Sequence, residues 1–273
     1  MGERSGQGAP VLRTKLFGVV APSAGWVPPL RFLLRRARVL ALSRRWPRGR
    51  LLEVGCGGGA LLPEFSAAGH AVVGLESSER ALATARRVAD ATGGDYAVLG
   101  RPDEAWPQAF DLVCAFDVLE HIEDDAGALD QWLGWVRPGG LVCLSVPAHR
   151  RSWSAGDEWA GHYRRYDRSD LEALLASRGV QVEHFECYGF PLANLTEWVG
   201  ARTYRRLIAE RAANVDRSEA TAGSGVDQRD STRLFRWMDT LPGRLALRAA
   251  LLVQALFART DLGSGYLVLA RKP

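Results

Sequence analysis

Several features that mark other classes of protein are missing from this sequence. Its 273 residues include only four cysteines, and no two of them form a C-x-x-C pair. This pattern favours free, buried thiols in a reducing compartment over disulfides or a zinc site. The N-terminus has no apolar core of the kind that signal peptides carry, and the longest strongly apolar helical run, residues 249–258, is too short to span a bilayer. We therefore expect a cytoplasmic protein.

Acidic residues are missing from most of the N-terminal segment. Between Arg4 and Leu52 there are eleven basic residues and no acid, and subtracting these eleven from the overall net charge of +4 leaves −7 for the remainder. We expect residues 1–48 to form a basic cap, loose up to about residue 25 and helical over 29–45. The arginines of this helix either face solvent or contact a membrane surface or an anionic substrate. A nucleic-acid surface over the whole protein is disfavoured, although the basic segment leaves an RNA acceptor open as an alternative.

The most informative stretch covers residues 51–60, where a short apolar strand runs into a glycine loop and then a helix. Gly55, Gly57 and Gly59 have no Cβ, so they can take positive φ and let a ligand lie against bare backbone. Their spacing is G-x-G-x-G, whereas dinucleotide-binding proteins use G-x-G-x-x-G, so a nucleotide-dependent oxidoreductase is disfavoured. The carboxylate of Glu53, two places before the first glycine, suits a ligand with a cationic amine.

Two later stretches add polar groups at strand ends. Glu76 follows a predicted strand over 71–75, where its carboxylate can accept both hydroxyls of a ribose. Ser77 or the next serine then caps a helix. A further predicted strand, over 110–116, leads into Asp117-Val118-Leu119-Glu120-His121-Ile122.

These three elements, in this order, resemble class I S-adenosylmethionine (SAM) methyltransferases of the small-molecule type, which includes the methyltransferase type 11/12 group and the ubiquinone-pathway O-methyltransferases. The resemblance implies an α/β fold with a doubly wound, seven-stranded, Rossmann-like sheet whose last strand is antiparallel. It also implies SAM as the cofactor. The family commonly has an aspartate after the third strand, but Arg101 stands there, so adenine recognition falls to the neighbouring residues. The implied cofactor-binding residues are Glu53, Gly55, Cys56, Gly57, Gly59, Glu76, Ser77, Pro102, Asp103, Asp117 and Val118.

Residues 147–166 are dense in aromatic, histidine and arginine side chains and follow the carboxyl end of a strand, where ligands bind in open parallel sheets. Three histidines are candidate general bases because an imidazole titrates near neutral pH; they are His121, His149 and His162. A structural hydrogen bond is the alternative for His121, and a loop contact for His162. Substrate binding is predicted for the run His162, Tyr163, Arg164, Arg165 and Tyr166, in which the arginines either grip an acidic group or are solvated.

A metal ion is a further hypothesis from the resemblance. Asp117, Glu120 and His121 resemble the acidic-acidic-histidine set that some ubiquinone-pathway O-methyltransferases use for a divalent ion. Oxygen ligands with one imidazole suit magnesium, manganese or zinc.

The predicted SAM-binding domain covers 49–190 and 263–273. Residues 191–262 form a helical insertion or lid with a disordered linker over 212–231. Its two apolar surfaces must be buried against the domain, against a hydrophobic acceptor or against a membrane; they comprise Leu195, Trp198, Val199, Leu207 and Ile208, and Leu245, Leu251, Leu252, Val253, Leu256 and Phe257.

The sequence thus predicts methyl transfer to a small or lipid-like acceptor that can carry an acidic group, with oxygen as the favoured atom. A peripheral membrane contact is expected with it. An RNA methyltransferase and a non-catalytic SAM-binding module are the alternatives.

Overall fold

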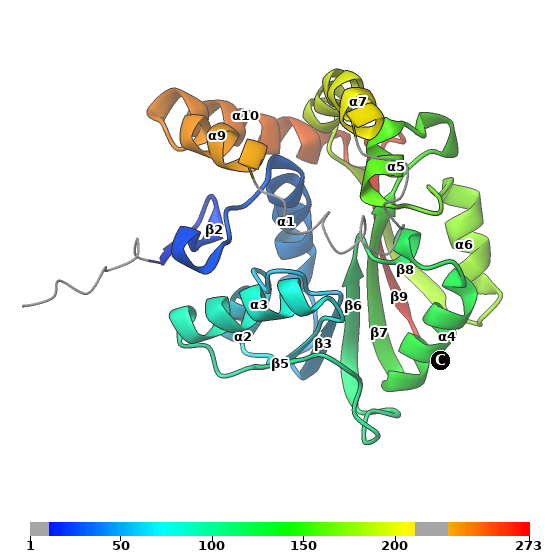
Figure 1. Ribbon diagram of the computed structural model, residues 1–273. Helices are drawn as coiled ribbons and strands as arrows, with labels where there is room; N and C mark the ends of the chain where they lie inside the picture. The colour runs from blue at the N-terminus through cyan, green and yellow to red at the C-terminus, as the bar shows by residue number, and fades with distance from the viewer. Residues whose placement is uncertain (1–10, 211–228) are drawn as a thin grey trace, which may run out of the picture.

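The computed structural model describes residues 11–210 and 229–273, and it is built on a seven-stranded sheet in the order β5-β4-β3-β6-β7-β9-β8 (Figure 1). Strands β3 to β7 are parallel, and β9 is antiparallel to both of its neighbours. The predicted sheet, with its antiparallel last strand, is confirmed. The strands are β3 (Arg50–Val54), β4 (Ala71–Leu75), β5 (Ala97–Leu99), β6 (Phe110–Phe116), β7 (Val136–Pro147), β8 (Gln181–Tyr188) and β9 (Gly265–Arg271).

Helices cover both faces of the sheet, which is why the central strands are apolar along their whole length. Figure 1 shows α1 (Leu30–Ser43), α2 (Leu62–Ala67) and α3 (Glu79–Thr92) on one side, and α4 (Asp125–Trp135) and α6 (Arg168–Ala176) on the other. Neighbouring residues of β3 divide between the two cores: Leu51 packs with the first group of helices and Leu52 with the second. The strand order reverses between β3 and β6: from β3 the chain builds outward through β4 and β5, and then returns to build the other side from β6. In open parallel sheets, ligands bind in the crevice at the carboxyl ends of the strands on either side of such a point.

Residues 11–25 are ordered, and the prediction that they are loose is wrong. They form a hairpin of β1 (Leu12–Thr14) and β2 (Gly18–Val20), followed by a short 3-10 helix, η1 (Pro22–Ala24). The segment holds its place because Phe17, Val19 and Trp26 are buried in the same core as α1.

The arginines of α1 point into the protein, so the prediction of a solvated or membrane-facing arginine surface on this helix is also wrong. Arg36 is buried and lies 2.5 Å from Glu64 of α2. Arg38 makes two 2.8 Å bonds to Glu186 of β8. The arginines of α1 therefore neutralise acids that the rest of the chain supplies, whereas Arg44, Arg45 and Arg48 after it are exposed.

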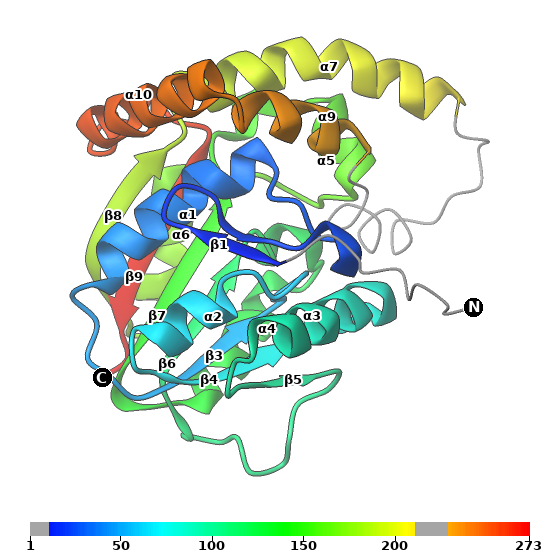
Figure 2. The same cartoon turned by 90° about the vertical axis from the view of Figure 1, so that its left-hand side faces the viewer.

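The described part of the insertion consists of α7 (Leu192–Glu210), α9 (Arg229–Met238) and α10 (Leu241–Phe257), which lie along one side of the molecule (Figure 2). Both α9 and α10 bury one side against the protein, α9 through Met238 and α10 through Leu247. Gln254 fastens α10 to α1 by donating to the Leu34 carbonyl. Of the linker predicted for 212–231, residues 212–228 lie outside the described part, and 229–231 begin α9.

Candidate active site

The glycine loop after β3 is packed on every side except one. Gly55, Gly57 and Gly59 all have positive φ, between 54° and 70°. A Cβ at Gly55 would lie 2.5 Å from Val118, and a Cβ at Gly58 would lie 2.5 Å from Trp26. A Cβ at Gly57 would meet no atom within 4 Å. Gly57 is therefore where bare backbone faces space that a ligand can fill.

Glu76 stands beside this loop at the carboxyl end of β4. Its two carboxylate oxygens accept 2.8 Å hydrogen bonds from the backbone amides of Gly57 and Ser78. Ser78, not the exposed Ser77, caps α3 by accepting a bond from Ala81. Each oxygen keeps a second lone pair, so the side chain is fixed in place and can still accept from two hydroxyls.

The residues proposed for the adenine lie in the loop after β5. Pro102 and Asp103 are both exposed, and one carboxylate oxygen of Asp103 accepts a 2.8 Å bond from Ala105. The loop starts next to Glu76, whose backbone amide donates to the Leu99 carbonyl. The contact of Pro102 and Asp103 with the adenine stays a prediction.

Glu53 is almost fully buried, and one of its carboxylate oxygens has no partner among the described residues. Burial raises its pKa to about 8, and the nearby Arg35 offsets only part of that effect. A cationic amine would supply both the missing partner and the opposite charge. The loop, Glu76 and Glu53 therefore fit a ligand that combines a ribose with an ammonium group, as SAM does. Burial raises the pKa of the neighbouring Cys56 thiol well above its usual value, so this cysteine is a packing residue and not a thiolate.

Asp117 follows β6 with a positive φ of 55°. Its carboxylate lies 2.5 Å from Arg35 and accepts bonds from Ser145 and Tyr188. Burial alone would raise its pKa, but Arg35 and Arg31 hold the pKa below its ordinary value. Its predicted cofactor contact stays a prediction, because the structure gives the carboxylate several protein partners.

A polar cluster follows Asp117 directly, in the short 3-10 helix η2 (Leu119–His121). Glu120 is 0% exposed, and neither of its carboxylate oxygens has a partner among the described residues. The His121 and His162 rings meet edge to face, with their centres 4.6 Å apart. Burial lowers the pKa of His121 to about 4 and raises that of Glu120. At neutral pH the His121 imidazole is therefore uncharged, and burial favours the uncharged form of the Glu120 carboxyl.

His162 is held by Asp157, a residue to which the sequence analysis gave no role. Asp157 belongs to α5 (Ala155–Ala160), which begins with a capping box made with Ser154. One Asp157 oxygen lies 2.9 Å from Nδ1 of His162 and accepts a 2.7 Å bond from Arg165. Because an ionised carboxylate only accepts, Nδ1 carries a proton, so in the neutral imidazole the free lone pair is on Nε2. The sequence signal for this pair was the capping pattern Ser154-x-x-Asp157, five residues before His162.

Arg165 pairs with acids of the protein, and its predicted contact with an acceptor stays a prediction. It is 3% exposed and bonds Asp157 as well as Glu197 of α7. Arg164 pairs with Asp125, which also accepts the Tyr166 hydroxyl. Arg164 and Arg165 therefore hold acidic side chains of the protein in place.

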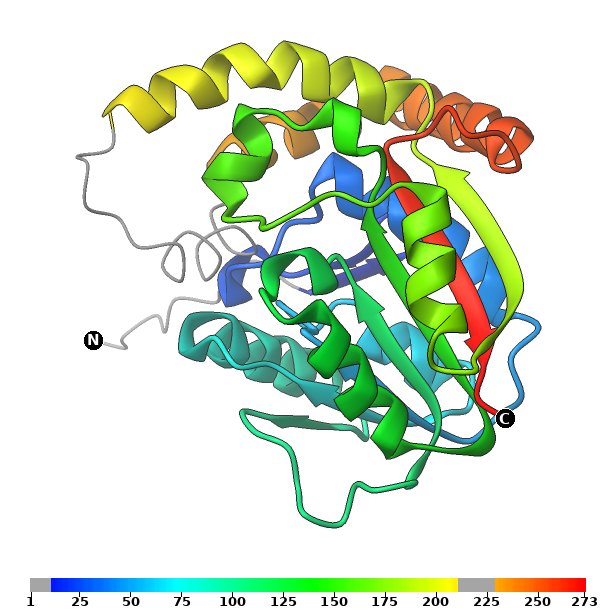
Figure 3. The same cartoon turned by 90° about the vertical axis from the view of Figure 1, so that its right-hand side faces the viewer.

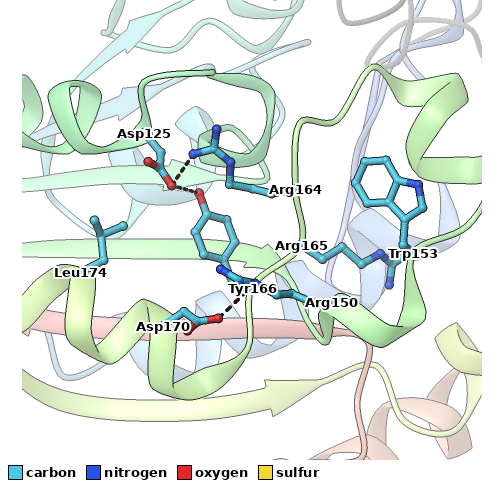
Figure 4. Close-up of a pocket in the computed structure, with 8 residues that line it drawn as sticks. All are labelled: Asp125, Arg150, Trp153, Arg164, Arg165, Tyr166, Asp170 and Leu174. Atoms are coloured by element: carbon cyan, nitrogen blue, oxygen red, sulfur yellow. Dashed lines mark hydrogen bonds and ion pairs between the residues drawn. The ribbon is translucent and has the colours of Figure 1, made fainter.

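The same arginines line a cavity of about 580 Å³, and Figure 4 shows Arg164 and Tyr166 converging on Asp125 inside it. Arg150 lies on another wall and pairs with Asp170. Tyr163 is half-buried, and its backbone amide donates to the backbone carbonyl of Glu120, which brings this loop against the polar cluster.

His149, the third candidate base, does not join the cluster. Its ring lies against Tyr266 of β9, whose hydroxyl is 3.3 Å from Nδ1. The hypothesis that Asp117, Glu120 and His121 form a metal site is also modified. Asp117 is held by arginines, whereas Glu120, His121 and His162 each bring one ligand atom to within 4.8 Å of the other two.

Fold and site together define a class I SAM-dependent methyltransferase. The chain belongs to the methyltransferase-domain family, whose sequence profile matches residues 30–185. The ubiquinone biosynthesis O-methyltransferase of Paramagnetospirillum magneticum is 31% identical over 162 residues, which are 53% of this chain and 64% of that protein. Other relatives of that name are matched over 41% to 45% of their length.

Solved structures show the same fold. A putative methyltransferase from Bacillus halodurans aligns with a TM-score of 0.56 at 16% identity, over 88% of this chain and 99% of that one. Phosphoethanolamine N-methyltransferase 2 of Haemonchus contortus, solved with SAM, aligns with a TM-score of 0.52 at 18% identity, over 91% of this chain and 54% of that one.

Replacing Glu76 with alanine should weaken binding of S-adenosylhomocysteine by about 1–3 kcal/mol, because charged hydrogen bonds to the ligand are lost and the Gly57 amide loses its partner. Titration calorimetry measures the change. Glu79→Ala, an exposed acid one helical turn further along, is the matched control and should bind normally. Equal affinity in both variants would remove Glu76 from the cofactor site.

Binding of S-adenosylhomocysteine should also release a proton at pH 7. Free Glu53 is mostly protonated there because its pKa is about 8, and the ligand's ammonium group favours the ionised form. Affinity should therefore rise as the pH increases from 7 through 8. Calorimetry in two buffers of different ionisation enthalpy counts the proton, and Glu53→Gln should abolish the difference. Identical enthalpies with the wild-type protein would contradict the pairing.

Proposed function

We propose that this methyltransferase acts on an oxygen of a hydrophobic, lipid-like acceptor that it meets at a membrane surface, with His162 as the general base. The observation that carries the proposal is the ordered set Asp157–His162–His121 beside the cofactor loop. The loop and the cluster are adjacent because Val118, two residues before Glu120, packs against Gly55. Relatives named as O-methyltransferases support oxygen as the acceptor atom.

SAM supplies an electrophilic methyl group on a sulfonium. The protein would orient the acceptor hydroxyl toward that methyl group, and the electron pair of the broken C–S bond would leave with sulfur as the new O–C bond forms. His162 Nε2 takes the hydroxyl proton, and the ionised Asp157 stabilises the imidazolium that results. The neighbouring His121 stays neutral because burial lowers its pKa to about 4, so it adds no repelling charge.

A divalent ion is the second candidate device for activating the acceptor. Glu120, His121 and His162 bring one ligand atom each to within 4.8 Å of the others, and both Glu120 oxygens lack a partner among the described residues. These side chains would hold magnesium, manganese or zinc, which would acidify a bound hydroxyl. Activity that survives exhaustive chelation would remove this candidate and leave His162 as the base.

The RNA alternative has lost part of its support. It depended on the basic N-terminal segment, and three arginines of α1 are now seen to pair with acids of other elements. A non-catalytic SAM-binding module would not need the buried Asp157–His162 pair.

The test offers purified protein and methyl-labelled SAM to three acceptors: a phenol with a polyprenyl tail in vesicles, the same phenol without its tail, and an RNA. We expect label mainly in the tailed phenol, with kcat/KM at least about tenfold above the tailless one, since each buried CH₂ contributes about 0.8 kcal/mol. Equal use of both phenols would refute the lipid-like acceptor, and label in the RNA alone would refute the proposal.

A further inference from the structure

Helix α10 exposes an apolar line on its outer side. Leu241, Leu245, Leu252 and Leu256 are all exposed, and Leu256 reaches 81%. Their spacing of four, seven and four residues places them on one face of the helix. The opposite side is already buried against the protein through Leu247. The outer leucines therefore do not belong to the core that α10 forms with the described part of the domain.

Helix α7 continues this surface. Leu195, Trp198 and Val199 are exposed, Trp198 by 67%, and they share a face with the arginines at 202, 205 and 206. We call the exposed side of α7 and α10 the outer face. It consists of Leu195, Trp198, Val199, Arg202, Arg205, Arg206, Leu241, Leu245, Arg248, Leu252 and Leu256.

The two helices lie one after the other on the same side of the molecule. Figures 2 and 3 show them following one another along the same side of the molecule, beyond the sheet. Their junction is fixed, because the Phe190 ring packs at a tilt against Phe257 with ring centres 4.9 Å apart and Asn194 donates to the Leu262 carbonyl. Gln254 then ties the junction to the Gly189 amide and to α1.

The described charges of the outer face have one sign. Arg202, Arg205, Arg206 and Arg248 lie on it, and none of them forms an ion pair with an acid whose side chain the structure describes. The acids nearby are used elsewhere: Glu197 turns inward to Arg31 and Arg165. Apolar residues bordered by arginines on one helical face are typical of helices that lie in a membrane interface.

We propose that the outer face docks on the surface of an anionic lipid bilayer, with α7 and α10 lying in the plane of the interface. The inference rests on the proposed function, because the bilayer would hold the hydrophobic acceptor. A second copy of this chain is a poorer occupant, since like-charged arginines would meet across the contact. In the described part of the chain no single helix is long and apolar enough to span a membrane; the pair Thr232–Met238 and Leu241–Phe257 passes that test together, bent by 93°.

A chain of side-chain hydrogen bonds links α7 to the proposed base, His162. Glu197 of α7 bonds Arg165, Arg165 bonds Asp157, and Asp157 holds His162. A bilayer that fixes α7 therefore lies three side-chain contacts from the imidazole.

The test is co-sedimentation of the full chain with vesicles of phosphatidylcholine alone or with 30% phosphatidylglycerol, a composition chosen to be clearly anionic (about one lipid in three). The wild-type protein should bind the anionic vesicles at least about tenfold more tightly, and added salt should weaken the binding. Leu252→Ser with Leu256→Ser should reduce binding about tenfold or more. Arg202→Ser with Arg206→Ser should remove the preference for anionic lipid. Leu12→Ser, at an exposed leucine of the hairpin, is the control and should bind normally.

Each variant must also bind S-adenosylhomocysteine like the wild-type protein, which separates lost docking from lost folding. Wild-type protein that stays in the supernatant, or a double-leucine variant that still sediments, would overturn the proposal. A dimer that dissociates on the leucine substitutions would assign the face to a second copy and overturn it too. Vesicle binding without methylation of any tailed phenol would leave docking intact and refute only the acceptor.

Discussion

Gly57→Val should abolish binding of S-adenosylhomocysteine, with a loss of at least about 100-fold, or ~3 kcal/mol. Two effects add. The new side chain would fill the open space beside the loop, where no protein atom lies within 4 Å of a Cβ, and a β-branched residue is strained at a φ of 54°. Titration calorimetry measures the affinity, and a thermal melt measures the stability.

Gly179→Val is a matched control for this variant. Gly179 follows α6, has a φ of 69°, and would also place its Cβ in open space. The control should lose a similar amount of stability and keep its affinity for S-adenosylhomocysteine. Wild-type affinity in Gly57→Val would show that the cofactor does not lie against this loop.

His162→Asn should lower kcat for methyl transfer by about 10²–10⁴-fold while leaving the affinity for S-adenosylhomocysteine unchanged. The substitution removes the only Nε2 that Asp157 orients and leaves a side chain that can still bond to Asp157. His184→Asn is the control, because His184 is a partly exposed histidine that bonds Glu186 on β8, away from the cluster.

Asp157→Asn should lower kcat by a smaller factor. The pH profile of this variant should show whether Asp157 positions His162 for catalysis or has only a structural role. With a neutral amide beside Nδ1, the imidazolium is no longer stabilised, so the acid limb of kcat/KM should move to lower pH. A His162→Asn enzyme with full kcat would make another group the base. An Asp157→Asn enzyme with an unchanged pH profile would reduce Asp157 to a structural residue.

The elements and the cofactor loop could be predicted from the sequence because their signals are local. The apolar run before Gly55, the G-x-G-x-G spacing and the acid at Glu76 all lie within 26 residues of one another. A strand that ends in glycines and leads to a helix N-terminus has few alternative geometries. The antiparallel last strand came from the family resemblance, not from a local pattern.

The pairing of the charged side chains could not be predicted, because each pair joins distant parts of the chain. Arg35 meets Asp117 and Arg38 meets Glu186 only once the sheet and α1 are packed. From sequence alone, a helix with many arginines and no acid looks solvated. Burial of opposite charges on other elements overrode that pattern, since an unpaired buried guanidinium is too costly to tolerate. The hairpin over residues 12–20 was missed for a similar reason, because its apolar residues pack on α1 and not on one another.

The position of β9 also affects how the protein can be made. This strand lies between β7 and β8, yet it is the last of the described strands along the chain. During synthesis, β7 and β8 must wait for more than seventy intervening residues before the strand that separates them emerges from the ribosome. Until then each presents an unpaired edge to the cell, and the two can pair with each other in the wrong register. A nascent chain stalled before residue 265 should therefore be a strong client for chaperones, although its cofactor loop is complete.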